Sequence, residues 1–184
     1  MNKTEVKKQI IIEKLADHLL VQGMKSSSLR QLAAAAGMSD RMLLHYFENK
    51  DELLTATLIL INERLIRILK STSTKQMPFQ ILLPHLAMMI KNPLIRPNLK
   101  LWLELVTLTN VEEEPYLATA RQICDTFFGW LTSIVQVERE EDRVPLASLA
   151  FATIEGFVLM DALGFDSLIT NALEGVGAAR VGSP

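Results

Sequence analysis

Residues 28–50 read SLRQLAAAAGMSDRMLLHYFENK, and this stretch decides the fold. The pattern is typical of two short helices joined by a glycine turn, which is the helix-turn-helix plan. Ser28 and Gln31 have the capping-box spacing that starts a helix. Gly37 supplies the positive φ that a tight turn requires, and Ser39 is a good N-cap for the second helix. The sequence therefore predicts helices over about residues 28–35 and 40–46.

Helices this short are not stable alone. Apolar residues at helical spacing can form a small core between them: Leu32, Ala36, Met38, Leu43 and Tyr46. The two helices must also pack on their neighbours in the chain. Residues 4–21 carry an apolar stripe that ends at Gly23. A second capping-box pair, Asn49 and Glu52, opens a long helix over about residues 50–70.

At these positions the sequence resembles the TetR family of repressors, in which a helix-turn-helix is followed by a Tyr-Phe pair and a lysine. The similarity covers residues 11–54 and involves these residues: Gly23, Ser27, Ser28, Leu32, Ala33, Ala36, Gly37, Ser39, Tyr46, Phe47, Lys50 and Leu53. Two positions depart from the family pattern. Leu44 stands where the family usually has an aromatic residue that often contacts a phosphate, and Asp40 brings a carboxylate toward phosphates that repel it. The alternative is an ordinary helical hairpin within a bundle.

The resemblance implies a DNA-binding role for the second helix. Four residues would face base edges in the major groove: Ser39, Asp40, Arg41 and Met42. Arg41 makes either a bidentate contact to guanine or a phosphate contact, and Asp40 either caps the helix or accepts from a cytosine amino group. Four residues would hold the DNA backbone: Ser28, His45, Tyr46 and Lys50. Lys50 lies in the first turn of its helix, where free N–H groups favour an anion; otherwise it is a solvated surface lysine.

The charges are distributed as expected for a chain that meets a polyanion at one end. Residues 1–50 hold eight Lys/Arg and five Asp/Glu, whereas residues 51–184 hold eleven and sixteen. The net charge of the 184-residue chain is -2, which by itself argues against a nucleic-acid binder. A basic head on an acidic body therefore indicates that only the head contacts DNA.

Composition indicates a globular, cytoplasmic protein. Apolar residues make up 49% of the chain and charged residues 22%, which allows a real core. The single cysteine, Cys124, cannot form an internal disulfide or a cysteine metal cluster, so a reducing cytosol fits best. The most apolar segment, residues 81–90, is interrupted by Pro84 and His85 and is too short to span a membrane. We expect no signal peptide, no cofactor and no metal site.

Nearly every segment downstream also has helical character, so the expected fold class is all-α. Helices are expected to follow from residue 78 to about 91, then to about 110, from 115 to about 137, and from 145 to about 163. The tail from residue 172 is rich in Gly and Ala and is expected to be frayed. The expected organisation is a helix-turn-helix domain at residues 1–50, a ligand-binding and dimerisation domain at 51–171, and a flexible tail at 172–184.

A single recognition helix reads too few bases for useful specificity. We therefore expect a homodimer whose two heads lie about 34 Å apart on a palindrome. Two apolar stripes run along residues 115–137, and a helix that is apolar on two faces needs two partners. The predicted interface, which the resemblance supports, consists of Ile123, Phe127, Phe128, Leu131, Leu149, Ala152, Thr153, Gly156, Phe157 and Met160. The alternative is that both stripes are buried within one subunit.

The middle helices are rich in side chains that can line an adaptable apolar pocket, although composition alone fits an ordinary core. The resemblance favours a pocket for a small apolar or amphipathic effector. Its predicted lining is His85, Met88, Met89, Trp102, Leu105 and Val106. Glu104 is expected to be exposed, or else to pair with a cationic ligand. The ligand would favour one of two body geometries and act through the helix over residues 50–70.

These expectations describe a repressor that binds a double-stranded DNA operator as a dimer and is released by a small ligand. An enzyme is disfavoured, because the three histidines, His18, His45 and His85, lie far apart in the sequence. The sequence also shows no metal spacing, nucleophile elbow or phosphate-binding glycine loop. The alternative is a helical small-molecule-binding or interaction protein without sequence-specific DNA binding, which Leu44 and Asp40 favour.

Overall fold

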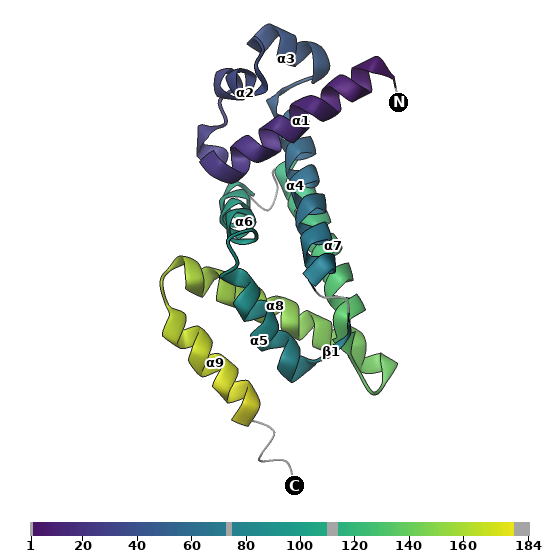
Figure 1. Cartoon of the computed structure of the whole chain (residues 1–184), viewed down its shortest axis with the longest axis vertical. Coiled ribbons are helices and arrows are strands. Elements are labelled where there is room, and N and C mark those ends of the chain that lie inside the picture. Colours follow the sequence, from purple (N-terminus) through teal and green to yellow (C-terminus); the bar gives the residue numbers. More distant parts are fainter. Residues whose placement is uncertain (1, 73–74, 110–113, 179–184) are drawn as a thin grey trace. The chain divides into compact units, whose positions relative to one another are not determined.

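The computed structural model describes residues 2–72, 75–109 and 114–178 (Figure 1). Within these ranges the chain folds into nine α-helices, two 3-10 turns and two strands of two residues each, so the expected all-α class is confirmed. The chain divides into two compact units. The first holds the described residues of Met1–Arg67 and Lys100–Cys124, and the second holds those of Ile68–Leu99 and Asp125–Pro184.

The first unit is built around the N-terminal helix, α1 (Lys3–Gln22). Asn2 and Glu5 form a capping box at its start, and Gly23, with φ 74°, ends it. Figure 1 shows α2 and α3 lying beside α1. The other elements are η1 (Met24–Ser26), α2 (Leu29–Ala36), α3 (Asp40–Tyr46), α4 (Lys50–Thr72) as far as Arg67, α6 (Arg96–Leu108) from Lys100, and α7 (Tyr116–Ile134) as far as Cys124.

The core of the first unit is centred on α1, which buries one face: Ile11, Leu15, Ala16 and Leu19. Each of the other α-helices adds buried side chains to the same cluster: Leu32, Leu43, Leu53, Leu54, Leu105 and Ala120. Each fully buried leucine stabilises the fold by about 1.5–3 kcal/mol. The two short helices are therefore held by long helices on which their leucines are buried, as their lack of independent stability requires.

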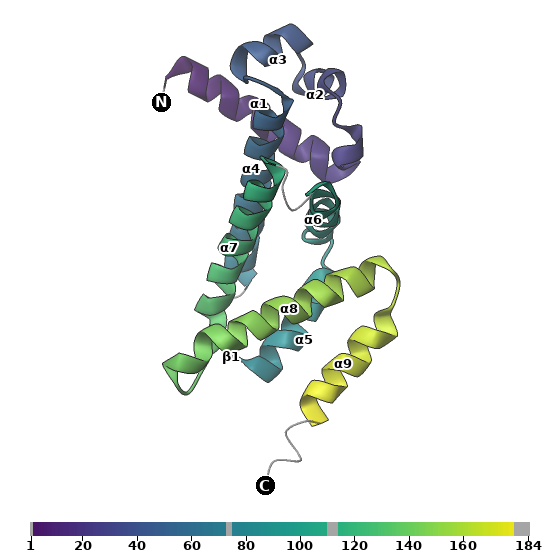
Figure 2. The same ribbon diagram turned by 180° about the vertical axis from the view of Figure 1, so that it is seen from behind.

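The second unit contains the end of α4, β1 (Met77–Pro78), α5 (Phe79–Ile90), the start of α6, the rest of α7, β2 (Val135–Gln136), η2 (Glu140–Asp142), α8 (Arg143–Ala162) and α9 (Asp166–Ala178). β1 and β2 pair in parallel, with Met77 opposite Val135. α5 packs against α8, and α9 packs against both, as the two opposite views show (Figures 1 and 2). Lys91 and Arg96 pair with the nearly buried carboxylate of Asp161 near the end of α8.

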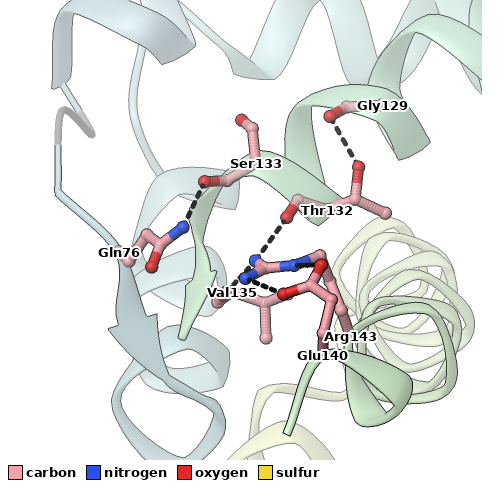
Figure 3. Close-up of polar contacts among 7 residues, drawn as sticks. All are labelled: Gln76, Gly129, Thr132, Ser133, Val135, Glu140 and Arg143. Atoms are coloured by element: carbon pink, nitrogen blue, oxygen red, sulfur yellow. Dashed lines mark hydrogen bonds and ion pairs between the residues drawn. The ribbon is translucent and has the colours of Figure 1, made fainter. Parts of the chain in front are cut away.

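Arg143 closes the corner between α7 and α8 (Figure 3). Its guanidinium donates to the carbonyl oxygens of Thr132 at 3.1 Å and Val135 at 2.7 Å. The Thr132 carbonyl is among the last of α7, which have no partner inside the helix, and Val135 directly follows α7, so this cation satisfies acceptors at and just beyond the end of the helix. The Glu140 carboxylate accepts from the same guanidinium at 2.9 Å and raises the pKa of Arg143. The first residue of α8 therefore fixes the direction in which the chain leaves α7.

The division of the structure differs from the boundary expected at residue 50. The residues of α4 from Lys50 to Arg67 belong to the N-terminal unit. Leu105 of α6 and Ala120 of α7 are also buried in the core of that unit. The expected tail differs as well, because residues 172–178 belong to α9, whose Ile169 is buried. Glycines lower helix propensity, but burial of one apolar side of α9 outweighs them here. Residues 179–184 lie outside the described residues.

One stretch of the described residues, Glu140–Ala162, is long and apolar enough to cross a membrane by length and composition alone. Residues 81–90 lie in the shorter apolar helix Phe79–Ile90, and Glu140–Ala162 was not singled out from the sequence. The core helix of a globular protein passes the same test. In α8, Ala147, Ile154 and Val158 are buried within the second unit, whereas Leu149 and Leu159 are exposed.

Candidate nucleic-acid interface

The connection between α2 and α3 has the geometry that the sequence predicts. The Ser28 hydroxyl accepts from the Gln31 N–H at 3.3 Å, and the Gln31 side chain accepts from the Ser28 N–H at 3.1 Å. Gly37 has φ 75° and ψ 38°, the left-handed conformation that a residue without a Cβ adopts easily. Ser39 caps α3, because its hydroxyl accepts from the Met42 N–H at 3.3 Å. These three predictions are confirmed.

Two lysines of α1 hold the helix-turn-helix in place. Lys14 donates to the Ala36 carbonyl oxygen at 3.1 Å and so satisfies the end of α2. The Lys8 ammonium lies 5.0 Å from the centre of the Phe47 ring, directly after α3. Lys8 also pairs with Glu52 of α4 at 3.1 Å. Side chains of α1 therefore contact both the end of α2 and the end of α3.

The outer face of α3 is open to solvent. The residues predicted to contact bases are all exposed: Ser39, Asp40, Arg41 and Met42. Leu43, by contrast, is completely buried and anchors the helix. An open depression of about 740 Å³ on this face is lined by Ser39, Arg41, Met42, Leu44, His45 and Tyr46. The exposed side chains thus form one continuous surface, as entry into a major groove requires.

The positive charges of Arg41 and Lys50 are available to bind an anion such as a phosphate. Within the described residues, the side chains of Arg41 and Lys50 form no ion pair or hydrogen bond. Lys50 is the first residue of α4 and is half-buried. His45 is exposed, and its ring packs edge-on against Tyr46 with 5.3 Å between the ring centres. The phosphate contacts proposed for Ser28 and these residues stay predictions.

The start of α4 differs from the predicted capping box. Asn49 accepts from the Glu52 N–H at 2.8 Å, as expected. The Glu52 carboxylate, however, accepts from the N–H of Glu48 rather than that of Asn49. The Glu48 N–H lowers the pKa of the Glu52 carboxyl, and Lys8 lowers it further. The attraction of Lys8 accounts for the difference, because it draws this carboxylate toward α1.

The comparisons agree with this geometry. Residues 11–57 match the sequence model of the bacterial regulatory proteins of the tetR family. A TetR-family transcriptional regulator from Cytophaga hutchinsonii has the same fold, with a TM-score of 0.73 and 17% identity over 95% of this chain and 93% of that one. A protein from Rhodococcus that is classed as a TetR-family transcriptional regulator also has this fold. Its TM-score is 0.70 and its sequence identity is 19%, over 94% of this chain and 97% of that one. No curated protein sequence matches the chain.

FadR from Bacillus subtilis, solved in complex with stearoyl-CoA, is more distant. Its TM-score is 0.55 and its identity 16%, over 90% of this chain and 95% of that one. At identities this low, such neighbours show the fold alone.

A capped, exposed recognition helix on a small helical head defines a helix-turn-helix DNA-binding domain. The head is the DNA-binding domain of the TetR family, and the chain has the fold of TetR-family transcriptional regulators.

The residues predicted to line an effector pocket lie on α5, in the second unit, and on the part of α6 that belongs to the first unit. On α5, His85 is half-buried, Met88 is exposed and Met89 is buried. On α6, Trp102 is half-buried, Leu105 is buried and Val106 is exposed. Leu105 belongs to the core of the first unit and Trp102 packs against that core. The effector site stays a prediction.

Two residues predicted for the dimer interface face inward. Leu131 and Phe157 are buried within the second unit, so they cannot form part of a surface. Helical periodicity finds apolar stripes but does not tell which stripe faces a partner. Phe127 and Phe128 are half-buried and lie against Phe151 of the same unit, with ring centres 5.6 and 6.2 Å apart.

The other predicted interface residues reach the surface to different degrees. Leu149, Ala152 and Gly156 are exposed along one side of α8. Three more are half-buried: Ile123, Thr153 and Met160.

Glu104 is the residue that the sequence reasoning placed wrongly. Its carboxylate accepts from the Met24 N–H at 2.6 Å. A Cβ built on Gly23 would lie 2.7 Å from both carboxylate oxygens. No local pattern identifies a partner eighty residues away in the chain. Arg30, in the first turn of α2, is exposed and adds a positive charge to the helix-turn-helix.

Proposed function

We propose that the protein is a repressor that binds a palindromic operator as a homodimer and leaves it when a small apolar or amphipathic ligand binds. The observation that carries this proposal is the outer face of α3. Asp40, Arg41 and Met42 are exposed there, while Leu43 anchors the helix in the core. Because the caps and the anchor are formed within the protein, little ordering is needed when the helix meets DNA.

The charges on this surface suit a groove that is flanked by phosphates. Arg41 supplies donors that match the O6 and N7 acceptors of guanine. Lys50 and the free N–H groups at the start of α4 suit a phosphate oxygen. Asp40 lies in the first turn of α3, where the helix dipole favours a carboxylate. It can therefore remain near the DNA and accept from a cytosine amino group.

The exposed side of α8 is the proposed dimer surface. The exposed residues repeat at i, i+3, i+7 and i+10 and so form one stripe, Leu149, Ala152, Gly156 and Leu159, which Leu163 continues directly after the end of α8. Leu149 is 52% exposed and Leu163 is 59% exposed. Continuous exposed apolar surface marks interaction sites. A Cβ at Gly156 would meet nothing within 4 Å, which leaves room for a second helix to approach closely.

The class of ligand is supported by one structural neighbour. FadR from Bacillus subtilis was solved with stearoyl-CoA, an amphipathic molecule. We expect no cofactor, no metal and no catalytic activity, and a cytoplasmic location, where an operator is accessible.

Glu104 offers a way for a ligand to act on the head within the first unit. Its hydrogen bond ties α6 to the turn that joins α1 to α2. A ligand that favours another position of α6 must lengthen or break this bond. The ligand can shift the position of the head only by its difference in affinity for the two geometries.

A selection from random-sequence DNA tests the proposal. The wild-type protein should enrich a palindrome whose half-sites lie about 10 base pairs apart, centre to centre. Arg41→Ala should weaken binding about 5- to 150-fold. Lys50→Ala should reduce the slope of log affinity against log salt by about one. Lys70→Ala, which removes an exposed cation at the other end of α4, is the matched control and should change neither quantity.

The competing function is a helical ligand carrier without sequence-specific DNA binding. It predicts that no palindrome is enriched and that Arg41→Ala binds DNA as the wild type does. That result would refute the repressor, whereas an enriched palindrome that depends on Arg41 would exclude the carrier. Equal effects of Lys50→Ala and Lys70→Ala would show that the phosphate contact is assigned wrongly.

A further inference from the structure

The exposed face of α3 carries two large apolar side chains. Met42 is 53% exposed and Leu44 is 44% exposed, whereas Leu43 between them is completely buried. Both line the open depression on this face, together with Arg41 and His45. Single exposed apolar residues are ordinary on a protein surface. Here, however, two of them stand on a helix of seven residues whose outer face meets DNA in the proposed function.

Helical geometry places the two side chains on either side of a polar row. Successive residues of an α-helix turn by about 100°, so Arg41 and His45, four apart, point in similar directions. Met42 then lies on one flank of this row and Leu44 on the other. The side of α3 that faces the core is occupied by Leu43. The two apolar side chains therefore stay at the surface, where they flank the cation.

A major groove offers one apolar group on its base edges, the C5 methyl of thymine, and otherwise hydrogen-bond donors and acceptors. We propose that Met42 and Leu44 each pack against a thymine methyl, on the two sides of the base pair that faces Arg41. This inference rests on the proposed function, and it specifies thymine as the base that Met42 and Leu44 contact. Leu44 then reads a base at the position where an aromatic phosphate contact was expected from the resemblance.

The test removes the methyl groups from the DNA and leaves the protein unchanged. The probe is the duplex that the wild-type protein enriches from random-sequence DNA, with each thymine replaced in turn by deoxyuridine. Two thymines in each half-site should lose about fourfold in affinity on replacement, which corresponds to one buried methyl-sized group. All other thymines should tolerate deoxyuridine.

Protein variants then assign each methyl to its side chain. In Met42→Ala, one of the two sensitive thymines should become insensitive to deoxyuridine, and in Leu44→Ala the other should. Val21→Ala is the matched control, because Val21 is an exposed apolar residue of the head that lies on α1. It should keep both sensitivities. Because Met42 and Leu44 are exposed, these changes should leave the melting temperature of the protein unchanged.

The outcomes separate this inference from the function on which it depends. If a duplex is enriched and Arg41→Ala weakens its binding, but no thymine is sensitive to deoxyuridine, the methyl contacts are refuted and the repressor stands. Sensitivities that persist in both alanine variants would refute the assignment to Met42 and Leu44. If no duplex is enriched at all, the proposed function fails first, and this inference fails with it.

Discussion

The carboxylate of Glu104, on α6, accepts a hydrogen bond from the backbone N–H of Met24 at 2.6 Å. Met24 directly follows Gly23, which ends α1, and it starts the short turn that leads to α2. A hydrogen bond to an ionised acceptor is about twice as strong as a neutral one. One side chain of α6 therefore fixes the turn through which α1 leads into the helix-turn-helix.

Removal of this acceptor should destabilise the protein. Glu104→Ala leaves the N–H of the buried Met24 without its partner, which costs about 1–3 kcal/mol of unfolding free energy. Urea denaturation followed by circular dichroism measures the loss. Glu63→Ala, at an exposed glutamate of α4, is the control and should leave the midpoint unchanged. Equal stability of the two variants would contradict a structural role for the Glu104 bond.

Gly23→Ala should be destabilising for two separable reasons. Gly23 has φ 74° and ψ -180°, a conformation that other residues rarely adopt and that costs about 1–3 kcal/mol. The new Cβ would also displace the Glu104 carboxylate, 2.7 Å away, from Met24. In a Glu104→Ala background only the backbone cost remains, so the loss should be smaller by at least about 0.5 kcal/mol.

A matched glycine separates the two causes. Gly164 has φ 78°, and a Cβ there would meet nothing within 4 Å. Gly164→Ala should therefore destabilise the protein by the same amount with and without Glu104→Ala. Additive effects of Gly23→Ala and Glu104→Ala would rule out the contact between the two positions.

Gly156→Arg should prevent dimer formation without harming the fold of the subunit. A Cβ at this position meets nothing within 4 Å of its own chain, and arginine favours a helix by about 0.8 kcal/mol over glycine. A long charged side chain would nevertheless block a helix that approaches α8. Gly129→Arg, at an equally open glycine of α7, is the control. Light scattering after size-exclusion chromatography should give a monomer mass for the first variant and a dimer mass for the second; the same mass for both would exclude this surface.

Acid should weaken the fold partly through Glu52. Hydrogen bonding to the Glu48 N–H, aided by Lys8, lowers the pKa of Glu52 below its ordinary value of 4.5. A lowered pKa in the folded state stabilises the protein above the ordinary value, and this contribution is lost as the pH falls through the lowered pKa. Stability measured by denaturant from pH 7 to pH 3 should fall less steeply below pH 4.5 in Glu52→Gln. Parallel curves for the variant and the wild type would contradict this contribution.

The head could be predicted from the sequence because its signals are local. The capping box of Ser28 and Gln31, the left-handed turn at Gly37 and the cap at Ser39 each involve residues within three positions of one another. Such patterns depend only on short stretches of backbone, so they can be recognised without knowing how the helices pack. Even here one local prediction was wrong in part, because Lys8 on another helix draws Glu52 away from Asn49.

The remainder of the fold depends on which helices pack against one another, and residues close together in the sequence do not determine this. The apolar stripes of α7 and α8 were visible in the sequence, but burial of Leu131 and Phe157 in their own subunit was not. The same is true of Glu104, whose partner lies far away in the chain. α9 was missed because its glycines and alanines are typical of a frayed end, although burial of Ile169 stabilises it as a helix.

The cap at the start of α1 has a practical consequence for work with purified protein. The Asn2 side chain accepts from the Thr4 N–H, and the Asn2 N–H donates to Glu5, so helical order begins at the third residue. A tag whose junction replaces Asn2 would remove the hydrogen bonds that start α1, the helix against which α2 and α3 pack.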